Sequence, residues 1–378
     1  MVDYQLINIT KSVLNKNTDD NIIIDDWKSV VGSARSSGLL PCLAYYYQSI
    51  PNEKKPSPEI TNFFKKILIQ STVVGMNQLS AVDEMQNTFE KNKIYNLVVK
   101  GAKTKTRYPD EVLRSMGDID ILYKAEQHKD FYNLMMDSLC YESFQEGRKN
   151  DTYTKDKIIV VEAHRQLVST ESEYIEYLDT VWDRAIPCPN CEYTYEMTIE
   201  DEFIYNIIHL VEHFKHGGVG IRFIMDIWVY NNLEMNREYL KTELEKLELY
   251  DFYLTISQLA DYWFGDGKST ELLEKLGEFI CSSGIFGNRE NVSALAIEDG
   301  SKFKTLIRIC FPNYKEMASM FLWLEKYPFL LPIAWVLRAF RSLTKRKGNV
   351  KVQLNTIKDG DVEKGKEIKA FYKECGLE

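Results

Sequence analysis

Two aspartates one residue apart inside an apolar run are the feature of this sequence that most clearly suggests chemistry. Asp118 and Asp120 flank Ile119 in the run "DIDILY". Side chains alternate along a β-strand, so both carboxylates are expected on one face, with Ile119 and Ile121 on the other. Carboxylates are costly in a strand that packs on a core, so the pair indicates a bound divalent cation. A solvated edge strand is the alternative.

A third carboxylate, Glu162, lies in "KIIVVEAHRQL", another run of strand character. Alternation places His164 on the same side as Glu162 and turns Ile159, Val161 and Ala163 to the other side. If this run pairs with the first, three carboxylates reach a common face and can hold metal ions for phosphoryl or nucleotidyl transfer. The alternative for Glu162 is a surface position at a strand end.

A glycine at the end of a third apolar run supplies the other half of such a site. Gly101 ends "NLVVKG" and follows Lys100. Glycine at a turn lets the backbone approach a phosphate, and the N–H groups of a helix start favour the anion. In the alternative interpretation the basic residues of this stretch form a solvated loop: Lys100, Lys103, Lys105 and Arg107.

These residues, in this order, resemble the nucleotidyltransferase superfamily. The closest resemblance is to its uncharacterised branch, with K-G, Y-P, R and D-I-D, then a strand glutamate, H-x₃-H and an apolar helix that carries an aspartate. The matching positions are Lys100, Gly101, Tyr108, Pro109, Arg114, Asp118, Asp120, Glu162, His164, His209, His213 and Asp226. The resemblance covers about residues 20–235, with Tyr327–Arg341 as a candidate extension.

Two positions depart from the family pattern. Ala102 stands where glycine or serine is usual, which removes a hydroxyl contact to phosphate. Gly101 and Asp118 are 17 residues apart (118 − 101), so the long loop between them must fold back over the pocket. Both departures allow an alternative function, a catalytically degenerate nucleotide-binding or regulatory module of the same fold.

The resemblance implies an enzyme that moves a nucleoside monophosphate from a nucleoside triphosphate, such as ATP, to a hydroxyl and releases pyrophosphate. Two Mg²⁺ ions are the implied cofactors, with Asp118, Asp120 and Glu162 as ligands and Glu162 alternatively as a base. The implied nucleotide-binding residues are Lys100, Gly101, Ala102 and Arg114. The implied acceptor-side residues are His164, His209, His213, Arg222 and Asp226.

Several of these residues have ordinary structural alternatives. Arg114 could pair with Asp118 or Asp120, and Arg222 and Asp226, four residues apart, could form an intrahelical ion pair. His209 and His213 share a helical face that would suit a metal, but no third ligand accompanies them in the sequence.

The hydrophobic pattern predicts an α+β fold, with a small mixed sheet between helical segments. An N-terminal helical segment covers 1–90 and contains two long helices, weakened at Gly75. The nucleotidyltransferase core covers 91–195, and a larger C-terminal helical domain covers 196–345. A charged tail, 346–378, carries one short helix near its end.

Composition limits the partners. A net charge of −9 and a pI of about 5.4 argue against a broad nucleic-acid surface. The acceptor stays open between a small molecule, a protein side chain and an RNA end, with a small molecule favoured. The N-terminus lacks a secretory signal, which predicts a cytoplasmic protein.

Seven scattered cysteines are expected to be reduced and mostly buried. The lone C-x-x-C of Cys188 and Cys191 predicts a turn rather than a zinc site.

The apolar segment Met317–Leu343 is about as long as a membrane span, but Glu325, Lys326, Pro328 and Pro332 interrupt it. It is therefore expected to form two buried helical pieces joined at Tyr327–Pro328, and no transmembrane segment is predicted. A role at a membrane interface is left open.

Overall fold

A computed structural model describes residues 2–16, 22–24, 26–145, 150–284, 288–297, 301–314, 317–318, 321, 323–345 and 360–377. The chain divides into two compact units, which are considered separately. The first comprises Met1–Val211 and Gly220–Ile285, and the second comprises Glu212–Val219 and Phe286–Glu378. The domain boundaries expected after residues 90, 195 and 345 stay predictions.

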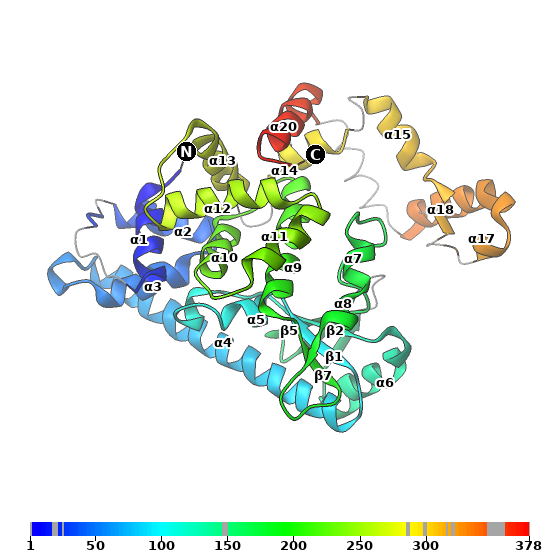
Figure 1. Cartoon of the computed structure of the whole chain (residues 1–378), viewed down its shortest axis with the longest axis horizontal. Helices are drawn as coiled ribbons and strands as arrows, with labels where there is room; N and C mark the ends of the chain where they lie inside the picture. The colour runs from blue at the N-terminus through cyan, green and yellow to red at the C-terminus, as the bar shows by residue number, and fades with distance from the viewer. Residues whose placement is uncertain are drawn as a thin grey trace. The chain divides into compact units, whose positions relative to one another are not determined.

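The first unit contains a mixed seven-stranded sheet in the order β3-β4-β5-β2-β1-β7-β6. Strands β1, β2, β5 and β7 of this sheet are labelled in Figure 1. The strands are β1 (Asn96–Val99), β2 (Ile119–Tyr123), β3 (Ser143–Gln145), β4 (Asn150–Lys155), β5 (Ile159–His164), β6 (Ile186–Pro187) and β7 (Thr194–Glu196). β2 is a central strand, antiparallel to β1 and parallel to β5. This sheet, together with the helices around it, confirms the predicted α+β class, and the two aspartates do not lie on an edge strand.

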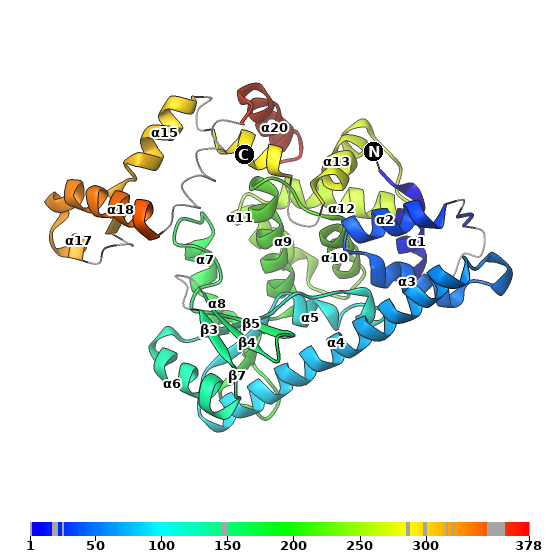
Figure 2. The same ribbon diagram turned by 180° about the vertical axis from the view of Figure 1, so that it is seen from behind.

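One face of the sheet packs against α4 (Pro58–Lys91) and α6 (His128–Asn133). Ile119, Ile121, Val161 and Ala163 are buried in this core, as strand alternation predicts. Stacked rings of Phe89 and Phe131, with centroids 4.8 Å apart, join the two helices. Asp120, Glu162 and His164 consequently belong to the opposite face, where α9 (Ile199–Lys215) and α10 (Ile221–Asn231) lie across the sheet from α4 (Figure 2).

The helical segments expected before the sheet are present. α4 runs without a break through Gly75, so the residues expected to be weakened there form one 34-residue helix. The preceding helices are α1 (Tyr4–Leu14), α2 (Trp27–Ser36), α3 (Leu40–Ser49) and the 3-10 turn η1 (Asn52–Lys54).

Short helical elements connect the strands, and longer helices follow them. The short ones are α5 (Gly101–Lys105), η2 (Glu111–Leu113), η3 (Ala125–Gln127), η4 (Leu134–Ser138), α7 (Ile175–Asp179) and α8 (Val181–Arg184). After α9 and α10 come α11 (Arg237–Lys246), α12 (Tyr250–Phe264) and α13 (Glu271–Ser283). Thr198 caps α9, because its hydroxyl accepts a hydrogen bond from the Asp201 N–H at 3.2 Å.

The second unit is helical where it is described. Its elements are α14 (Arg289–Leu295), α15 (Lys302–Cys310), α17 (Trp323–Lys326), η6 (Pro328–Leu330), α18 (Leu331–Lys345) and α20 (Val362–Glu374). α20 is the short helix expected near the end of the chain, and it packs on α14. A Cβ at Gly365 would lie 2.6 Å from the carbonyl oxygen of Ala294, so this contact needs glycine. Residues 346–359 of the predicted tail lie outside the described residues.

The apolar segment breaks at Tyr327–Pro328 as expected, but its second piece is not buried. Phe329 is 75% exposed and Val336 is 69% exposed, whereas Ala334 packs in a small core with Met317. The expectation of two buried pieces is therefore wrong for α18 in the part that is described. No helix among the described residues has the length and apolar character to span a membrane.

All seven cysteines are free thiols, as predicted, but only Cys42 and Cys375 are buried, so the expectation that most are buried is wrong. Cys188 and Cys191 lie in the turn between β6 and β7. The Cys191 N–H donates to the Cys188 carbonyl at 3.0 Å, and Asn190 has a φ of +63°. This geometry agrees with a turn shaped by asparagine.

Candidate active site

Asp120 and Glu162 are neighbours across the parallel pair β2–β5, where the register sets Asp120 opposite Glu162 and Leu122 opposite His164. One ligand atom from each of Asp120, Glu162 and His164 lies within 4.8 Å of the other two. The two runs that sequence alternation directed to a common face are thus adjacent strands. Asp118 directly precedes β2.

Asp120 is the most strongly held carboxylate of this group. The Lys100 ammonium donates to Asp120 Oδ1 at 2.7 Å, and His164 Nε2 lies 2.7 Å from the same oxygen. Burial opposes ionisation of Asp120, but Lys100 and His164 outweigh it and hold the pKa of Asp120 well below its usual range. Burial likewise disfavours the charge of Lys100, but nearby Tyr205 and Asp120 keep its pKa above the ordinary value.

Asp118 has a different environment. It is half-buried and lines a cavity of about 70 Å³ together with Asp120. Burial, and then the negative charge of Asp120, raise the pKa of Asp118. A second positive charge near Asp118 would therefore relieve an electrostatic cost that the protein carries without one.

The cavity lies where the turn after β1, the loop before β2 and two helices meet. It is lined by Lys100, Gly101, Arg114, Met116, Gly117, Asp118, Asp120, Phe203, Asn206, His209, Leu210, Arg222, Phe223, Asp226 and Ile227. The loop between Gly101 and Asp118 does fold back over the pocket, since Arg114, Met116 and Gly117 belong to it. A Cβ at Gly101 would meet Met116 Cγ at 3.1 Å, so glycine lets this loop pack closely on the helix start.

The structure places the predicted site residues in three sets: those that line the cavity, those grouped with Asp120, and those in neither place. Eight line the cavity: Lys100, Gly101, Arg114, Asp118, Asp120, His209, Arg222 and Asp226. Glu162 and His164 form the adjacent group with Asp120. Ala102 is buried in the sheet core, and His213 falls in the second unit; neither is among the described residues that line the cavity.

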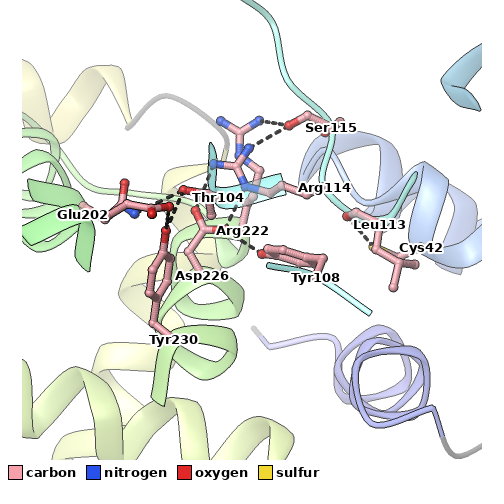
Figure 3. A network of polar contacts seen from close by, with 11 residues as sticks. Cys42, Thr104, Tyr108, Leu113, Arg114, Ser115, Glu202, Arg222, Asp226 and Tyr230 are labelled. Carbon is pink, nitrogen blue, oxygen red and sulfur yellow. Dashed lines mark hydrogen bonds and ion pairs between the residues drawn. The ribbon is translucent and has the colours of Figure 1, made fainter. Parts of the chain in front are cut away.

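Arg114 is fixed by a buried pair rather than by the aspartates of β2. Its Nε and Nη2 donate to the two oxygens of Asp226 at 2.8 and 2.9 Å, and the Tyr108 hydroxyl donates to the same carboxylate at 2.6 Å (Figure 3). The expected alternatives, Arg114 with Asp118 or Asp120 and Arg222 with Asp226, are therefore not the ion pairs found. Burial opposes the charge of Arg114, but Asp226 raises its pKa above the ordinary value.

Arg222 lines the cavity from α10 without sharing that pair. Its Nη1 donates to the Ser115 carbonyl at 3.3 Å, and Arg114 Nη1 donates to the same oxygen at 2.7 Å (Figure 3). Burial, and then repulsion from Arg114, lower the pKa of Arg222. The Arg222 guanidinium is thus a cation that the protein places beside the cavity at an electrostatic cost.

The basic residues after Gly101 do not form a solvated loop. Lys103 pairs with Glu196 at 2.9 Å, and Arg107 pairs with the buried Glu202 at 2.9 Å. Tyr230 also donates to Glu202 and lies 3.3 Å from the Thr104 hydroxyl (Figure 3). These contacts fix α5 and the residues just after it, and with them the Lys100–Gly101 turn, to β7, α9 and α10.

Some lining residues escaped the sequence interpretation. Phe203, Asn206 and Leu210 come from one face of α9, and Asn206 donates to the Thr104 hydroxyl at 3.1 Å. Phe203 and Asn206 are three residues apart, and Asn206 and Leu210 are four apart, which is the spacing of one helical face. Because His209 also follows Asn206 by three residues, this spacing could have identified them.

Comparison with known protein families identifies the group of proteins that this sequence resembles. A model of the family described as uncharacterised nucleotidyltransferase matches residues 25–265, well over half of the chain. The chain belongs to this family. The match contains every candidate site residue and ends before Tyr327–Arg341, the candidate extension of the resemblance. Searches of curated proteins and of solved structures found no significant match.

The donor atoms suit the metal that the family implies. Asp120 and Glu162 supply carboxylate oxygens on adjacent strands, which are the ligands that Mg²⁺ prefers, and Asp118 supplies another at the cavity wall. In the arrangement described, Lys100 supplies the positive charge next to Asp120. The residues therefore fit a divalent cation at this edge of the cavity.

Proposed function

We propose that the chain is a Mg²⁺-dependent nucleotidyltransferase that moves a nucleoside monophosphate from a nucleoside triphosphate to a hydroxyl of a small-molecule acceptor and releases pyrophosphate. One observation carries the proposal. Asp120 and Glu162 occupy opposed positions on neighbouring strands, beside a cavity that begins at Lys100 and Gly101. Bound Mg²⁺ would supply charge neutralisation for the triphosphate.

Asp118, Asp120 and Glu162 would hold the metal. Glu162 is the most exposed member of the Asp120–Glu162–His164 group, with a third of its side chain accessible, so it is also the carboxylate best placed to accept a proton from the acceptor hydroxyl. His164 would orient Asp120 through the 2.7 Å contact between them.

The nucleotide phosphates would lie at the start of α5. Gly101 leaves that backbone without a side chain, and Lys100 is near enough to Asp120 to balance its charge until a cation and phosphates are bound. Ala102 is buried and would support the turn through packing. Arg222 would contact an anionic group of the nucleotide or acceptor.

The acceptor would enter from the side formed by α9 and α10, where His209 lines the cavity. Both oxygens of Asp226 already accept hydrogen bonds from Arg114, and Tyr108 donates to one of them. We therefore assign Arg114 and Asp226 the role of fixing the loop over the cavity, in place of the direct nucleotide and acceptor contacts expected from the sequence.

The test is to incubate the protein with each α-labelled nucleoside triphosphate, Mg²⁺ and a small-molecule extract, and to follow the label and the released pyrophosphate. The proposal expects a labelled product that requires Mg²⁺ and disappears in Asp118→Asn and Asp120→Asn. Asp130→Asn, an exposed change on α6, is the matched control and should retain transfer. Equal labelling by Asp120→Asn would contradict the proposed site. Mg²⁺-ATP binding without turnover in any extract would favour the degenerate binding module.

A further inference from the structure

Lys105, the last residue of α5, is a buried cation that contacts no anionic group among the residues the structure describes. It is 3% exposed, and no described residue accepts a hydrogen bond from its ammonium group or forms an ion pair with it. A charge removed from water is costly unless it is paired and hydrogen-bonded. Burial lowers the pKa of Lys105 and Arg114 lowers it further, against the opposing effects of Glu111 and Asp110.

Gly75 makes room for this ammonium group. It lies inside the long helix α4, where glycine costs about 0.5–1 kcal/mol relative to alanine and no turn requires it. A Cβ at position 75 would lie 2.7 Å from Lys105 Nζ and 3.3 Å from Cε. The absence of a side chain at Gly75 thus leaves the space that the end of the Lys105 side chain occupies.

The lysine borders a cavity of about 310 Å³ between α3, α4 and the loop before β2, called here the Lys105 cavity. Among the described residues that line it, Lys105 is the single charged one. Leu40, Ile67 and Val74 supply apolar walls, and Ser71 lies beside the glycine. An adjoining hollow also reaches Lys105 but is lined by Asp110 and Glu111, which would repel an anion.

We propose that the Lys105 cavity binds a small organic acid, whose carboxylate group contacts the Lys105 ammonium and whose apolar body lies against α3 and α4. A volume near 300 Å³ is at the lower end of ligand pockets, so the ligand is small. A carboxylate supplies the acceptor that the lysine lacks, and an uncharged or cationic analogue of the same shape does not.

The Lys105 cavity and the candidate active site have one lining residue in common, Met116. Val112, Ser115 and Met116 line the Lys105 cavity, while Met116 also lines the active-site cavity. The Ser115 carbonyl accepts hydrogen bonds from Arg114 and Arg222. A ligand in the Lys105 cavity therefore contacts the loop that carries these groups. Binding of the acid does not depend on the proposed transfer reaction, so the two proposals can fail separately.

Calorimetric titration of the full chain with octanoate tests the site, with octylamine as the probe of opposite charge. Octanoate is expected to bind and octylamine is not. Lys105→Met should weaken octanoate binding by about 10-fold or more, the loss expected for a hydrogen bond to a charged group. Glu111→Gln, in the acidic hollow, is the matched control and should retain binding.

The melting temperature of Lys105→Met and a second variant, Gly75→Ala, allow the proposal to be tested even if Lys105→Met does not fold. Ligand-free Lys105→Met should melt no lower than the wild type, because the change removes an unpaired buried charge. Gly75→Ala retains the lysine but displaces its ammonium, so it should also weaken octanoate binding even if Lys105→Met fails to fold. Absence of octanoate binding by the wild type, or equal affinities for the wild type and the variants, would overturn the proposal.

Discussion

Two clusters in the first unit each join a carboxylate to a buried cation, and they use the pair differently. On the sheet, Lys100 contacts one oxygen of Asp120, and the group, which includes the partly exposed Glu162, lies beside a cavity. In the loop and helix cluster, Arg114 takes both oxygens of Asp226. The first arrangement leaves a carboxylate that can act as a ligand to a metal cation. The second uses its oxygens to fasten the loop over the cavity.

The comparison shows that charged residues from one sequence pattern need not share one role. Asp120 keeps one oxygen outside the contacts with Lys100 and His164, since both are made to Oδ1. Asp226 accepts on both oxygens, and Tyr108 adds a third hydrogen bond. We therefore expect changes in the loop cluster to act mainly on stability, and changes in the sheet cluster to act mainly on metal-dependent activity.

The largest effect is expected from Arg114→Met. Removal of one partner from a buried pair leaves Asp226 without its cation, which typically costs about 3–5 kcal/mol of stability. Denaturant unfolding followed by circular dichroism measures this. Lys103→Met removes a more exposed ion pair with Glu196 and should cost at most about 1 kcal/mol. A loss for Arg114→Met no larger than that for Lys103→Met would contradict the structural role assigned to the loop cluster.

Asp120→Asn should lower transfer by about 100-fold or more while retaining the fold, because the change removes a charged metal ligand. It should also destabilise the protein at neutral pH. The folded pKa of Asp120 is depressed, so the stability it contributes is present above its unfolded pKa of about 3.9 and is lost as pH falls towards the folded value. Unfolding of both proteins between pH 7 and 3 should thus show their difference shrinking below about pH 4. A difference that does not change with pH would contradict the assigned pairing.

Glu162→Gln should reduce transfer by about 10–100-fold and weaken Mg²⁺ binding, because the change removes one carboxylate of the group. The metal-free variant should be no less stable than the wild type, since the negative charge of Glu162 lies close to that of Asp120. Titration with Mg²⁺ and thermal unfolding in a chelator measure the two effects. Glu176→Gln, an exposed change on α7, is the control. Unchanged Mg²⁺ affinity in Glu162→Gln would exclude Glu162 from the metal site.

Local regularity explains what the sequence could predict. The two-residue period of a strand directed Asp120, Glu162 and His164 to one face and their apolar neighbours to the core, and no distant information was needed. Pairing of the two strands was a condition of the sequence interpretation, and the structure supplies it through the parallel register of β2 and β5. The helical spacing of Phe203, Asn206 and Leu210 carried similar information.

Contacts between distant segments could not be predicted in the same way. Arg114 and Asp226 are 112 residues apart, and their pairing depends on how α10 packs against the loop. The position of the Lys105 ammonium depends on the room left by a glycine in α4 thirty residues earlier, and the exposure of Phe329, in η6, depends on what packs around that turn. A solvated Lys105 was the alternative interpretation of the sequence and a buried Phe329 was expected, and tertiary packing gave the opposite in both cases.

The smallest effect is expected from Arg222→Met, which tests whether an arginine next to the loop cluster belongs to it. Arg222 makes a 3.3 Å hydrogen bond to Ser115, and both burial and Arg114 disfavour its charge. Its removal should therefore leave stability nearly unchanged, in contrast to Arg114→Met. If Arg222 contacts an anionic group of the nucleotide, the affinity for Mg²⁺-ATP should fall by about 10-fold, as for one charge-assisted hydrogen bond. Lys66→Met, an exposed change on α4, should alter neither quantity. A large loss of stability with unchanged ATP affinity would instead assign Arg222 to the loop cluster, because only a structural partner costs folding free energy without affecting the ligand.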